Sequence, residues 1–436
     1  MTVQRVVAAL IASMAAWGVA TPTWAVPGDP STPRTSIAST SALAAGPAFT
    51  MEQTLSDRAQ LTTIAFDGLA FLTGSLGSDS FFPPGKLADF WGFQYLRDND
   101  PSEMGHNTDF LTRAALNMLD TLTPDQRMRL VELATDQVDL INAFGMKRFE
   151  LMSANRRLLS GDLPAGATGL SRSKVKRWSQ ALYTMDGQIT LSRARVMGSL
   201  LSGLDSTQRA RLDAMAGVGM TSWPEVAEPA ELRPLSHDEK VAVMTYAGDM
   251  FSWYAGSVTA DVYFCPERHG TYFGSFYLKD APAVGNPNYT IGGNITADMG
   301  HAFLAALTPA QAQIITGLVD QQRETLLNIV DVRSSVATRL RASMNGRKIS
   351  ETAVDRLMSR YGRLDGQLAY MYASAFVAVA STLTPEQQVT LDGLRKQTVG
   401  NLTPTGAYLF STPIAMPSIT DADLFAMPKV RGQHRH

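Results

Sequence analysis

The sequence predicts an all-α protein made of two similar helical units in tandem. Two observations predict this fold class: the chain resembles itself at a nearly fixed offset, and one helix-start signal recurs along it. A third is the composition, with 45% hydrophobic, 18% charged and 8% aromatic residues, which is typical of a packed helical protein. The 436 residues suffice for two or three domains with cores of their own.

Self-comparison indicates the duplication. At an offset of 182, residues 63–98 lie over residues 245–280 without a gap, and twelve of these 36 positions are identical, where chance gives about two. Further matches follow at offsets of 185 and 179: Leu122-Thr123-Pro124 with Leu307-Thr308-Pro309, and Asp186-Gly187-Gln188 with Asp365-Gly366-Gln367. One length difference falls near the loop 161–173. We therefore expect two helical-bundle units packed as pseudo-symmetric halves.

Four stretches share a Leu-x-x-x-Gln pattern that predicts helix starts: 122–126, 307–311, 383–387 and, in a degenerate form, 204–208. In the first three, Thr is the expected N-cap, Pro takes the first helical position, and Gln closes a capping box. Apolar residues then recur at helical spacing, as in Leu130, Leu133, Ala134, Val138, Ile141 and in Ile315, Leu318, Val319, Leu326, Ile329. The aromatic segments 81–95 and 263–277 are predicted as loop with short helix.

The N-terminus has the pattern of a secretory signal peptide. Arg5 precedes an apolar run over residues 6–20, and a small-residue cleavage site follows, with cleavage expected after Ala25. The run is short for a membrane span, and no later run approaches that length. The sequence therefore predicts an exported protein, periplasmic or extracellular, whose mature chain has no transmembrane segment.

The expected organisation has six parts. These are a signal peptide (1–25), a disordered linker (26–50), helical unit 1 (51–217), a linker (218–232), helical unit 2 (233–400) and a Pro-containing C-terminal tail (401–436).

The Leu-Thr-x-x-Gln starts resemble the LTxxQ motif of the periplasmic stress-chaperone family, small all-helical proteins of the bacterial envelope. The resemblance covers four five-residue stretches. It implies a helical envelope protein.

Composition and motifs exclude several function classes. The net charge of -2 provides no basic surface for nucleic acid. A single Cys cannot form an intramolecular disulfide, and no CxxC pair exists for a structural zinc site. The motifs of serine hydrolases, P-loop NTPases, dinucleotide enzymes and zinc proteases do not occur.

The candidate site lies in unit 2 and uses residues that unit 1 lacks. Cys265 aligns with Pro83 and His269 with Leu87, so the only Cys and a nearby His occur in one copy. A thiolate and an imidazole four residues apart can bind a transition metal from one helix face. Cys-x-x-x-His also matches the c-type haem motif with its second Cys replaced by Arg268.

Further residues would complete this site. Met299 or His301 could supply the opposite axial ligand, and the rings of Tyr272 and Phe273 could wall an apolar cofactor. The predicted metal ligands are thus Cys265, His269 and His301. The alternative interpretation is a structural Cys and a hydrogen-bonded His.

Three functions follow from the sequence. The first is an exported helical protein that binds a metal or haem-type cofactor through unit 2 and is redox-active. The alternative is a non-enzymatic envelope binding or chaperone-like protein that holds a small ligand or a polypeptide without a cofactor. The third is an enzyme that uses the duplicated carboxylates, Asp79/Asp261, Asp98/Asp280 and Asp186/Asp365.

Overall fold

The chain is all-α, as predicted, and two short hairpins accompany the helices. The computed structural model describes residues 55–74, 109–216, 223–255, 281–283, 286–291, 294–399, 406–409, 412–415 and 423–428. The first series of helices is α3 (Asp57–Thr73), α5 (Asp109–Thr121), α6 (Pro124–Ser160), α7 (Arg172–Ser202) and α8 (Ser206–Ala216). The second is α9 (His237–Ala255), α11 (Asn294–Ala306), α12 (Pro309–Arg341), α13 (Glu351–Ala380) and α14 (Pro385–Val399). Two 3-10 turns, η4 (Ala230–Leu232) and η5 (Ala342–Asn345), complete the helical elements of these described ranges.

The short hairpins are the part of the fold that the sequence did not predict. Strand β1 (Ala281–Ala283) pairs antiparallel with β2 (Asn286–Ile291), and β3 (Gly406–Leu409) pairs antiparallel with β4 (Thr412–Ala415). Each is a two-stranded ribbon, too small to form a layer of the fold. Apolar periodicity cannot predict such ribbons, because their strands are so short.

The helix starts lie where the capping signals predict them. Thr123 caps α6: its hydroxyl accepts from the Gln126 N–H at 3.3 Å, and its own N–H donates to the Gln126 side chain at 2.9 Å. Thr308 caps α12 with the same reciprocal bonds. Thr384 does so at the start of α14. These three predictions are confirmed, because a capping box needs only neighbouring residues.

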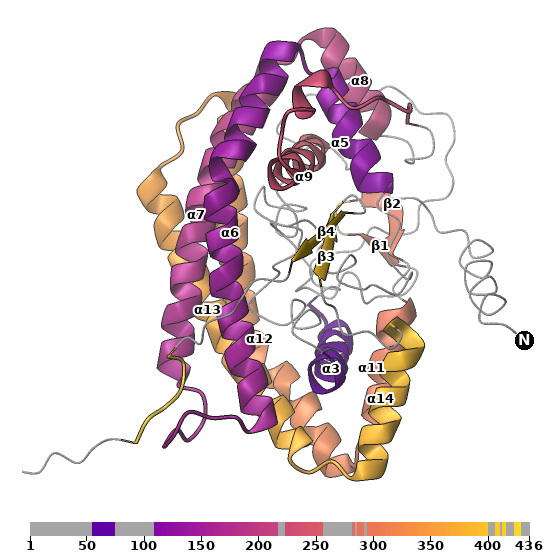
Figure 1. Ribbon diagram of the computed structural model, residues 1–436, viewed down its shortest axis with the longest axis vertical. Coiled ribbons are helices and arrows are strands. Elements are labelled where there is room, and N and C mark those ends of the chain that lie inside the picture. Colours follow the sequence, from indigo (N-terminus) through magenta and orange to yellow (C-terminus); the bar gives the residue numbers. More distant parts are fainter. Residues whose placement is uncertain are drawn as a thin grey trace, which may run out of the picture.

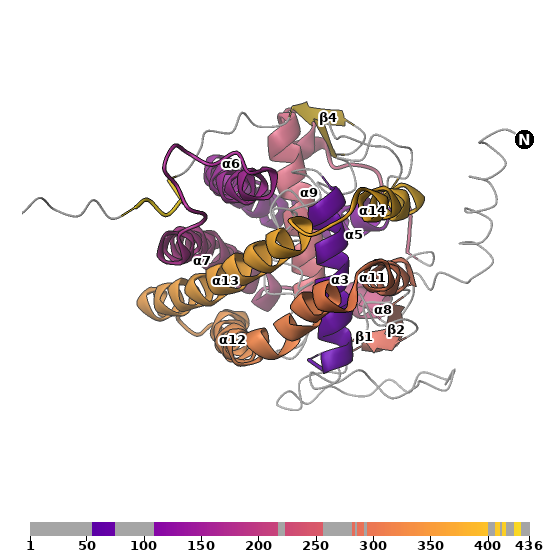
Figure 2. The same cartoon turned by 90° about the horizontal axis from the view of Figure 1, so that it is seen from below.

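The four long helices α6, α7, α12 and α13 gather on one side of the molecule (Figures 1 and 2). Beside them the shorter helices form two groups at opposite ends: α5, α8 and α9 at one end, and α3, α11 and α14 at the other (Figure 1). The most extensive helix contact joins α7 to α13. These two helices therefore form the centre of the fold.

Glycine residues allow α7 and α13 to approach closely. A Cβ at Gly187 would lie 3.0 Å from the Cβ of Met358, and one at Gly366 would lie 2.7 Å from the Cβ of Ser179. At the offset of 179 these two contacts are equivalent, because Gly187 corresponds to Gly366 and Ser179 to Met358. At Gly362 an added Cβ would lie 2.5 Å from the Ser179 carbonyl oxygen. The repeated Asp-Gly-Gln motif thus supplies the small residues of a helix crossing.

The first helix of each series packs mainly against the other series. Helix α3 contacts α11, α12, α13 and α14, whereas α9 contacts α5, α6 and α8. Each end group in Figure 1 therefore combines helices from both halves of the sequence. Units 51–217 and 233–400 are consequently not two separate bundles in space, although the order of their helices repeats. Their common descent stays a prediction of the sequence comparison.

Candidate functional site

The residues of the predicted cofactor site lie mostly outside the described part of the chain. This applies to Cys265, His269, Tyr272 and Phe273. Helix α11 contains Met299, whose side chain is not described, and His301, which is exposed. Among the described residues, no group of three or more His, Cys, Asp or Glu side chains could hold a metal ion. The cofactor hypothesis therefore stays a prediction from sequence.

The duplicated carboxylates that the structure describes are core residues. Asp186 and Asp365 are fully buried beside the glycines of the α7–α13 contact, and Arg148 and Arg333 are buried as well. Arg333 donates to the Tyr361 hydroxyl at 2.8 Å. The other four duplicated aspartates, Asp79, Asp261, Asp98 and Asp280, lie outside the described residues.

A buried polar cluster joins α9 to the first series. Arg193 on α7 forms an ion pair with Asp249 on α9, and its guanidinium lies 4.4 Å from the ring centroid of Tyr246. The Tyr246 hydroxyl donates to the Gln137 side chain on α6 at 2.5 Å. Burial raises the pKa of Tyr246 well above its ordinary value. Burial therefore favours the neutral hydroxyl, which is the form that donates this hydrogen bond.

An equivalent cluster joins α3 to the second series. Gln322 on α12 corresponds to Gln137 at the offset of 185. It accepts a short hydrogen bond from the Tyr372 hydroxyl and donates to the Gln60 side chain on α3 at 3.0 Å. In both halves a glutamine of the first long helix thus connects to the helix that comes from the other half. These two clusters therefore fix α9 against the first series and α3 against the second series.

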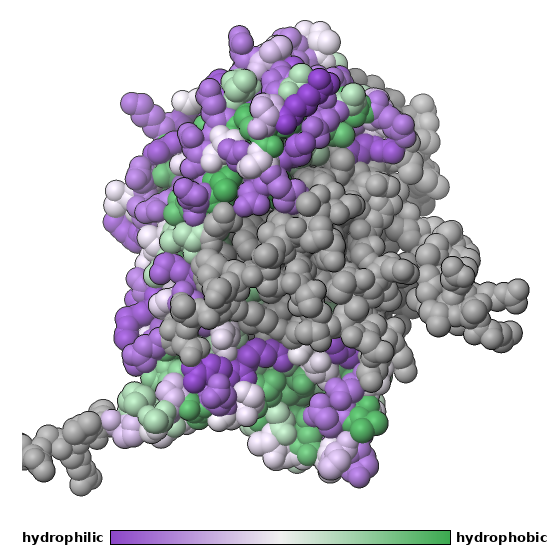
Figure 3. Space-filling view, viewed as in Figure 1, coloured by the Kyte–Doolittle hydropathy of each residue, from purple (hydrophilic) through white to green (hydrophobic). Residues whose placement is uncertain are grey.

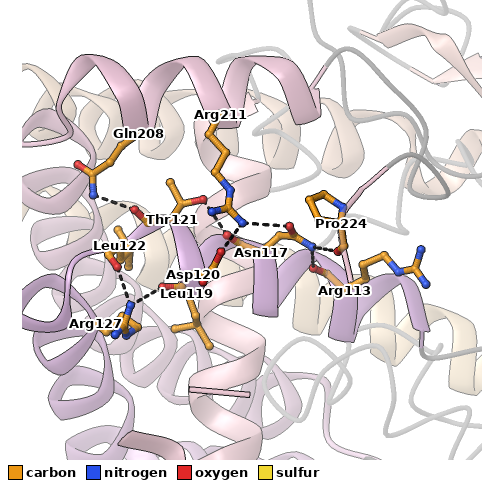
Figure 4. Close-up of polar contacts among 10 residues, drawn as sticks. All are labelled: Arg113, Asn117, Leu119, Asp120, Thr121, Leu122, Arg127, Gln208, Arg211 and Pro224. Carbon is orange, nitrogen blue, oxygen red and sulfur yellow. Dashed lines mark hydrogen bonds and ion pairs between the residues drawn. The ribbon is translucent and has the colours of Figure 1, made fainter. Parts of the chain in front are cut away.

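The helix-start motifs work in pairs, which sequence reasoning did not foresee. Gln208 at the start of α8 donates to the Thr121 carbonyl at 2.9 Å (Figure 4). It also donates to the Gln126 side chain at 2.6 Å. In the second series, the side chains of Gln311 and Gln387 bond to each other at 2.8 and 3.2 Å. Gln387 also reaches the carbonyl of Ala306, the residue that corresponds to Thr121. The Leu-Thr-x-x-Gln motif therefore fixes two helix starts against one helix end.

Other polar side chains at this junction also bond to backbone groups, and Arg211 forms an ion pair with Asp120 (Figure 4). Arg127 donates to the carbonyls of Leu122 and Leu119 at the end of α5. Asn117 donates to the Pro224 carbonyl at 2.9 Å and so holds the segment that leads to α9. Such bonds to otherwise unsatisfied carbonyls stabilise a helix end. This region is a structural joint, and its polar groups are used within the fold.

The α6–α7 turn binds a distant segment of the same chain. Residues 423–428, which we call the tail segment, lie beside this turn at the lower left of Figure 1. Three main-chain hydrogen bonds connect the two: Thr168 N–H to the Ala426 carbonyl at 3.0 Å, Ala426 N–H to the Gly169 carbonyl at 2.8 Å, and Ser171 N–H to the Leu424 carbonyl at 2.8 Å. The pairing is antiparallel, with Leu170 opposite Phe425. The tail segment is thus bound as an added strand.

Side chains complete this tail-docking site, which we define as Arg157, residues 163–171 and Lys174. Leu424 and Phe425 are each only 1% exposed and belong to the same hydrophobic core as Leu170. The Arg157 guanidinium lies 5.3 Å from the ring centroid of Phe425, within cation–π range. The Lys174 ammonium contacts both Asp423 carboxylate oxygens at 2.8 Å. Main-chain pairing and two buried side chains therefore act together.

Of the two helix connections that the structure describes at this place, only the one in the first half forms a tail-docking site. In the first half, residues 162–171 connect the C-cap Gly161 to α7, whereas in the second half only residues 347–350 connect Gly346 to α13. The additional residues include Gly169, whose φ of 141° favours glycine and whose carbonyl accepts from the tail segment. The length difference was visible in the sequence as a change of offset. The sequence did not show that this longer connection binds the tail segment, because the two are about 250 positions apart in the chain.

Comparisons with known proteins leave the site to be interpreted from its own geometry. No protein-family model, no curated protein and no solved structure matches this chain significantly. Within the described ranges, no helix is long and apolar enough to cross a membrane. On the face shown in Figure 3, the described surface is largely hydrophilic, and hydrophobic residues gather towards the end that contains α11 and α14.

Proposed function

We propose that this chain is an exported, non-enzymatic binding protein that holds extended polypeptide segments at the tail-docking site. One observation carries the proposal: the site already binds an extended segment through main-chain hydrogen bonds and two buried apolar side chains. Addition of a strand to an exposed backbone edge is a general mode of peptide recognition. The signal-peptide pattern and the LTxxQ resemblance support the exported, envelope part of the proposal.

The expected affinity for a separate peptide is moderate. Burial of Leu424 and Phe425 contributes about 1.5–3 kcal/mol each, and each hydrogen bond adds about 1 kcal/mol net. Association and ordering oppose these gains by at least about 4 kcal/mol, so we expect a Kd of about 0.1 to 1 mM. A tethered segment has an effective concentration in the millimolar range. The tail segment therefore competes strongly with any peptide, and the test needs a chain whose own tail is displaced.

The test uses the full chain with Leu424→Ser and Phe425→Ser, which removes the two buried side chains of the tail segment. A fluorescent peptide with the sequence of residues 419–430 is titrated with this variant and with the unchanged chain, and anisotropy is measured. We expect saturable binding to the variant, and binding at least ten-fold weaker to the unchanged chain. A peptide that carries the same two serines is the matched control and should not bind.

A second variant tests the main-chain part of the recognition. Ser171→Pro in the same background removes the N–H that donates to the Leu424 carbonyl, and it requires φ at this position to move from -89° towards about -65°. We expect the peptide to bind several-fold more weakly. Equal binding to the displaced and the unchanged chain would place the peptide elsewhere, and no binding at 1 mM would refute the proposal.

Two observations favour a second function, which is cofactor binding through unit 2. Cys265 and His269 occur in one half only, and His301 is exposed on α11. The cofactor would be a haem or a transition metal held by Cys265 and His269, with Met299 or His301 as a further ligand.

The cofactor prediction has a direct spectroscopic test. Protein purified from the exported fraction should show a Soret band or a stoichiometric transition metal. His269→Leu, the residue of the first half at this position, should abolish that signal with little loss of stability, whereas His434→Leu should leave it unchanged. A colourless, metal-free protein would exclude this function and leave polypeptide binding as the proposal.

A further inference from the structure

We infer that the tail-docking site selects segments with a carboxylate side chain two positions before an aromatic residue, and that Lys174 makes this selection. The inference rests on the proposed function, since it names the class of polypeptide that the same site would take. That class is an extended segment with an acidic residue followed directly by two large apolar residues. In the tail segment these are Asp423, Leu424 and Phe425.

Lys174 directs its ammonium group at the tail segment. It contacts both carboxylate oxygens of Asp423 at 2.8 Å and the Phe425 carbonyl oxygen at 3.0 Å. An ammonium has three N–H donors, so these three contacts use its full capacity. One contact recognises the backbone and two recognise the carboxylate. Lys174 can therefore make all three contacts only when the acidic side chain lies two positions before the residue whose carbonyl it binds.

The start of α7 adds to the preference for negative charge. Ser171 is the N-cap of α7, yet its side chain forms no capping bond: its hydroxyl contacts the Ser173 hydroxyl at 3.2 Å, while its backbone N–H donates to the Leu424 carbonyl. Lys174 lies in the first turn of this helix, so the carboxylate it binds is close to the positive end of the helix dipole. The tail segment thus supplies an acceptor and a negative charge at a helix start that lacks its own cap.

The second half provides an internal comparison. At the offset of 179, Ser171 corresponds to Ser350 and Lys174 to Ala353. There the Ser350 side chain caps its own helix by accepting from the Ala353 N–H. The serine thus caps its own helix in the second half, where Ala353 follows, whereas in the first half its hydroxyl contacts Ser173 and the tail segment lies at the helix start, where Lys174 follows. This difference assigns Lys174 to segment recognition.

The experiment compares peptides in the chain that carries Leu424→Ser and Phe425→Ser. Three peptides of residues 419–430 are titrated: unchanged, Asp423→Asn, and Asp421→Asn, which removes the same charge two positions earlier. The Asp423 side chain is 79% exposed, so its ion pair is worth at most about 1 kcal/mol, which corresponds to a loss of affinity of about 3- to 6-fold. We expect that loss for Asp423→Asn only, and its disappearance in 0.5 M salt.

Lys174→Met identifies the recognising group. We expect this variant to bind the unchanged and the Asp423→Asn peptides equally, and both more weakly than the Lys174 chain. Equal losses for the Asp421→Asn and Asp423→Asn peptides would overturn the selectivity, because net charge alone would then explain them. If no peptide binds at all, the proposed function fails instead.

A second measurement covers the case in which the serine variant does not fold. Hydrogen exchange at the amides of Ser171 and Ala426 is then measured in the full chain with its native tail segment. Asp423→Asn and Lys174→Met should each accelerate exchange about 3- to 6-fold, and the double variant should be no faster than Lys174→Met. Unchanged exchange in both single variants would overturn the role of Lys174.

Discussion

At the scale of residues, one buried ion pair lies where helices from different halves meet. Arg193, Asp249 and Tyr246 connect α7 with α9, and Gln137 extends this cluster to α6. Buried ionic groups stabilise little as a pair, but loss of one member leaves the other charge in a medium of low polarity. We therefore interpret the cluster as the feature that fixes the position of α9.

Asp249→Ala should lower the free energy of unfolding by about 3–5 kcal/mol, because the buried Arg193 guanidinium loses this carboxylate. The double variant with Arg193→Met and Asp249→Leu should lose clearly less than the sum of its two single substitutions. Urea unfolding followed by circular dichroism measures both. Asp320→Ala is the control, because Asp320 forms an exposed pair with Arg323 and should change stability by less than about 1 kcal/mol. Strict additivity of the two single substitutions would contradict this interpretation.

At the scale of elements, the helix starts are joined in pairs by their capping glutamines. Gln208 both closes the box at Asp205 and donates to the Thr121 carbonyl at the end of α5. Gln387 makes the equivalent bond to Ala306. One side chain thus satisfies polar groups of two helices, which explains why the motif recurs at matching places in both halves.

Gln208→Met, which preserves the side-chain volume, should lower the free energy of unfolding by about 1–3 kcal/mol, because the buried Thr121 carbonyl and the Asp205 N–H lose their partner. Gln313→Met on the exposed face of α12 is the matched control and should have little effect. Chemical denaturation of both variants at pH 7 provides the comparison. If the two substitutions reduce stability equally, the paired-cap interpretation is wrong.

At the scale of the whole molecule, α3 and α9 couple the two halves, because each packs mainly against helices of the other half. Each end group contains helices of both series, and the central α7–α13 contact joins the series directly. Neither half can therefore bury its apolar surface without the other. A chain arranged in this way should unfold as one cooperative unit, in contrast to two bundles on a linker.

Two equivalent substitutions test this coupling. Leu133→Ala in α6 and Leu318→Ala in α12 correspond at the offset of 185, both residues are buried, and each should destabilise by about 2–5 kcal/mol. Calorimetry should show a single transition in the unchanged chain, and either substitution should shift that whole transition to lower temperature. Two separate transitions, with Leu318→Ala moving only one of them, would show that the halves unfold independently.

The sequence by itself determined the features that depend on neighbouring residues. The starts of α6, α12 and α14 follow from Thr-Pro-x-Gln because the caps are local, and the all-α class follows from apolar spacing within each helix. The close contact of α7 and α13 was already present in the sequence as a repeated glycine, although its meaning emerged only when Gly187 and Gly366 were found facing Met358 and Ser179.

Only the tertiary structure decided which distant segments meet. The pairing of Gln208 with Gln126, the placement of α3 and α9 against the opposite series, and the docking of Phe425 beside Leu170 each join residues far apart in the chain. No local pattern encodes such contacts, because apolar surface is buried without directional preference and an extended strand pairs through backbone groups that every residue has. The candidate site at the α6–α7 turn was therefore invisible in the sequence, whereas the cofactor ligands that the sequence suggested still require their own test.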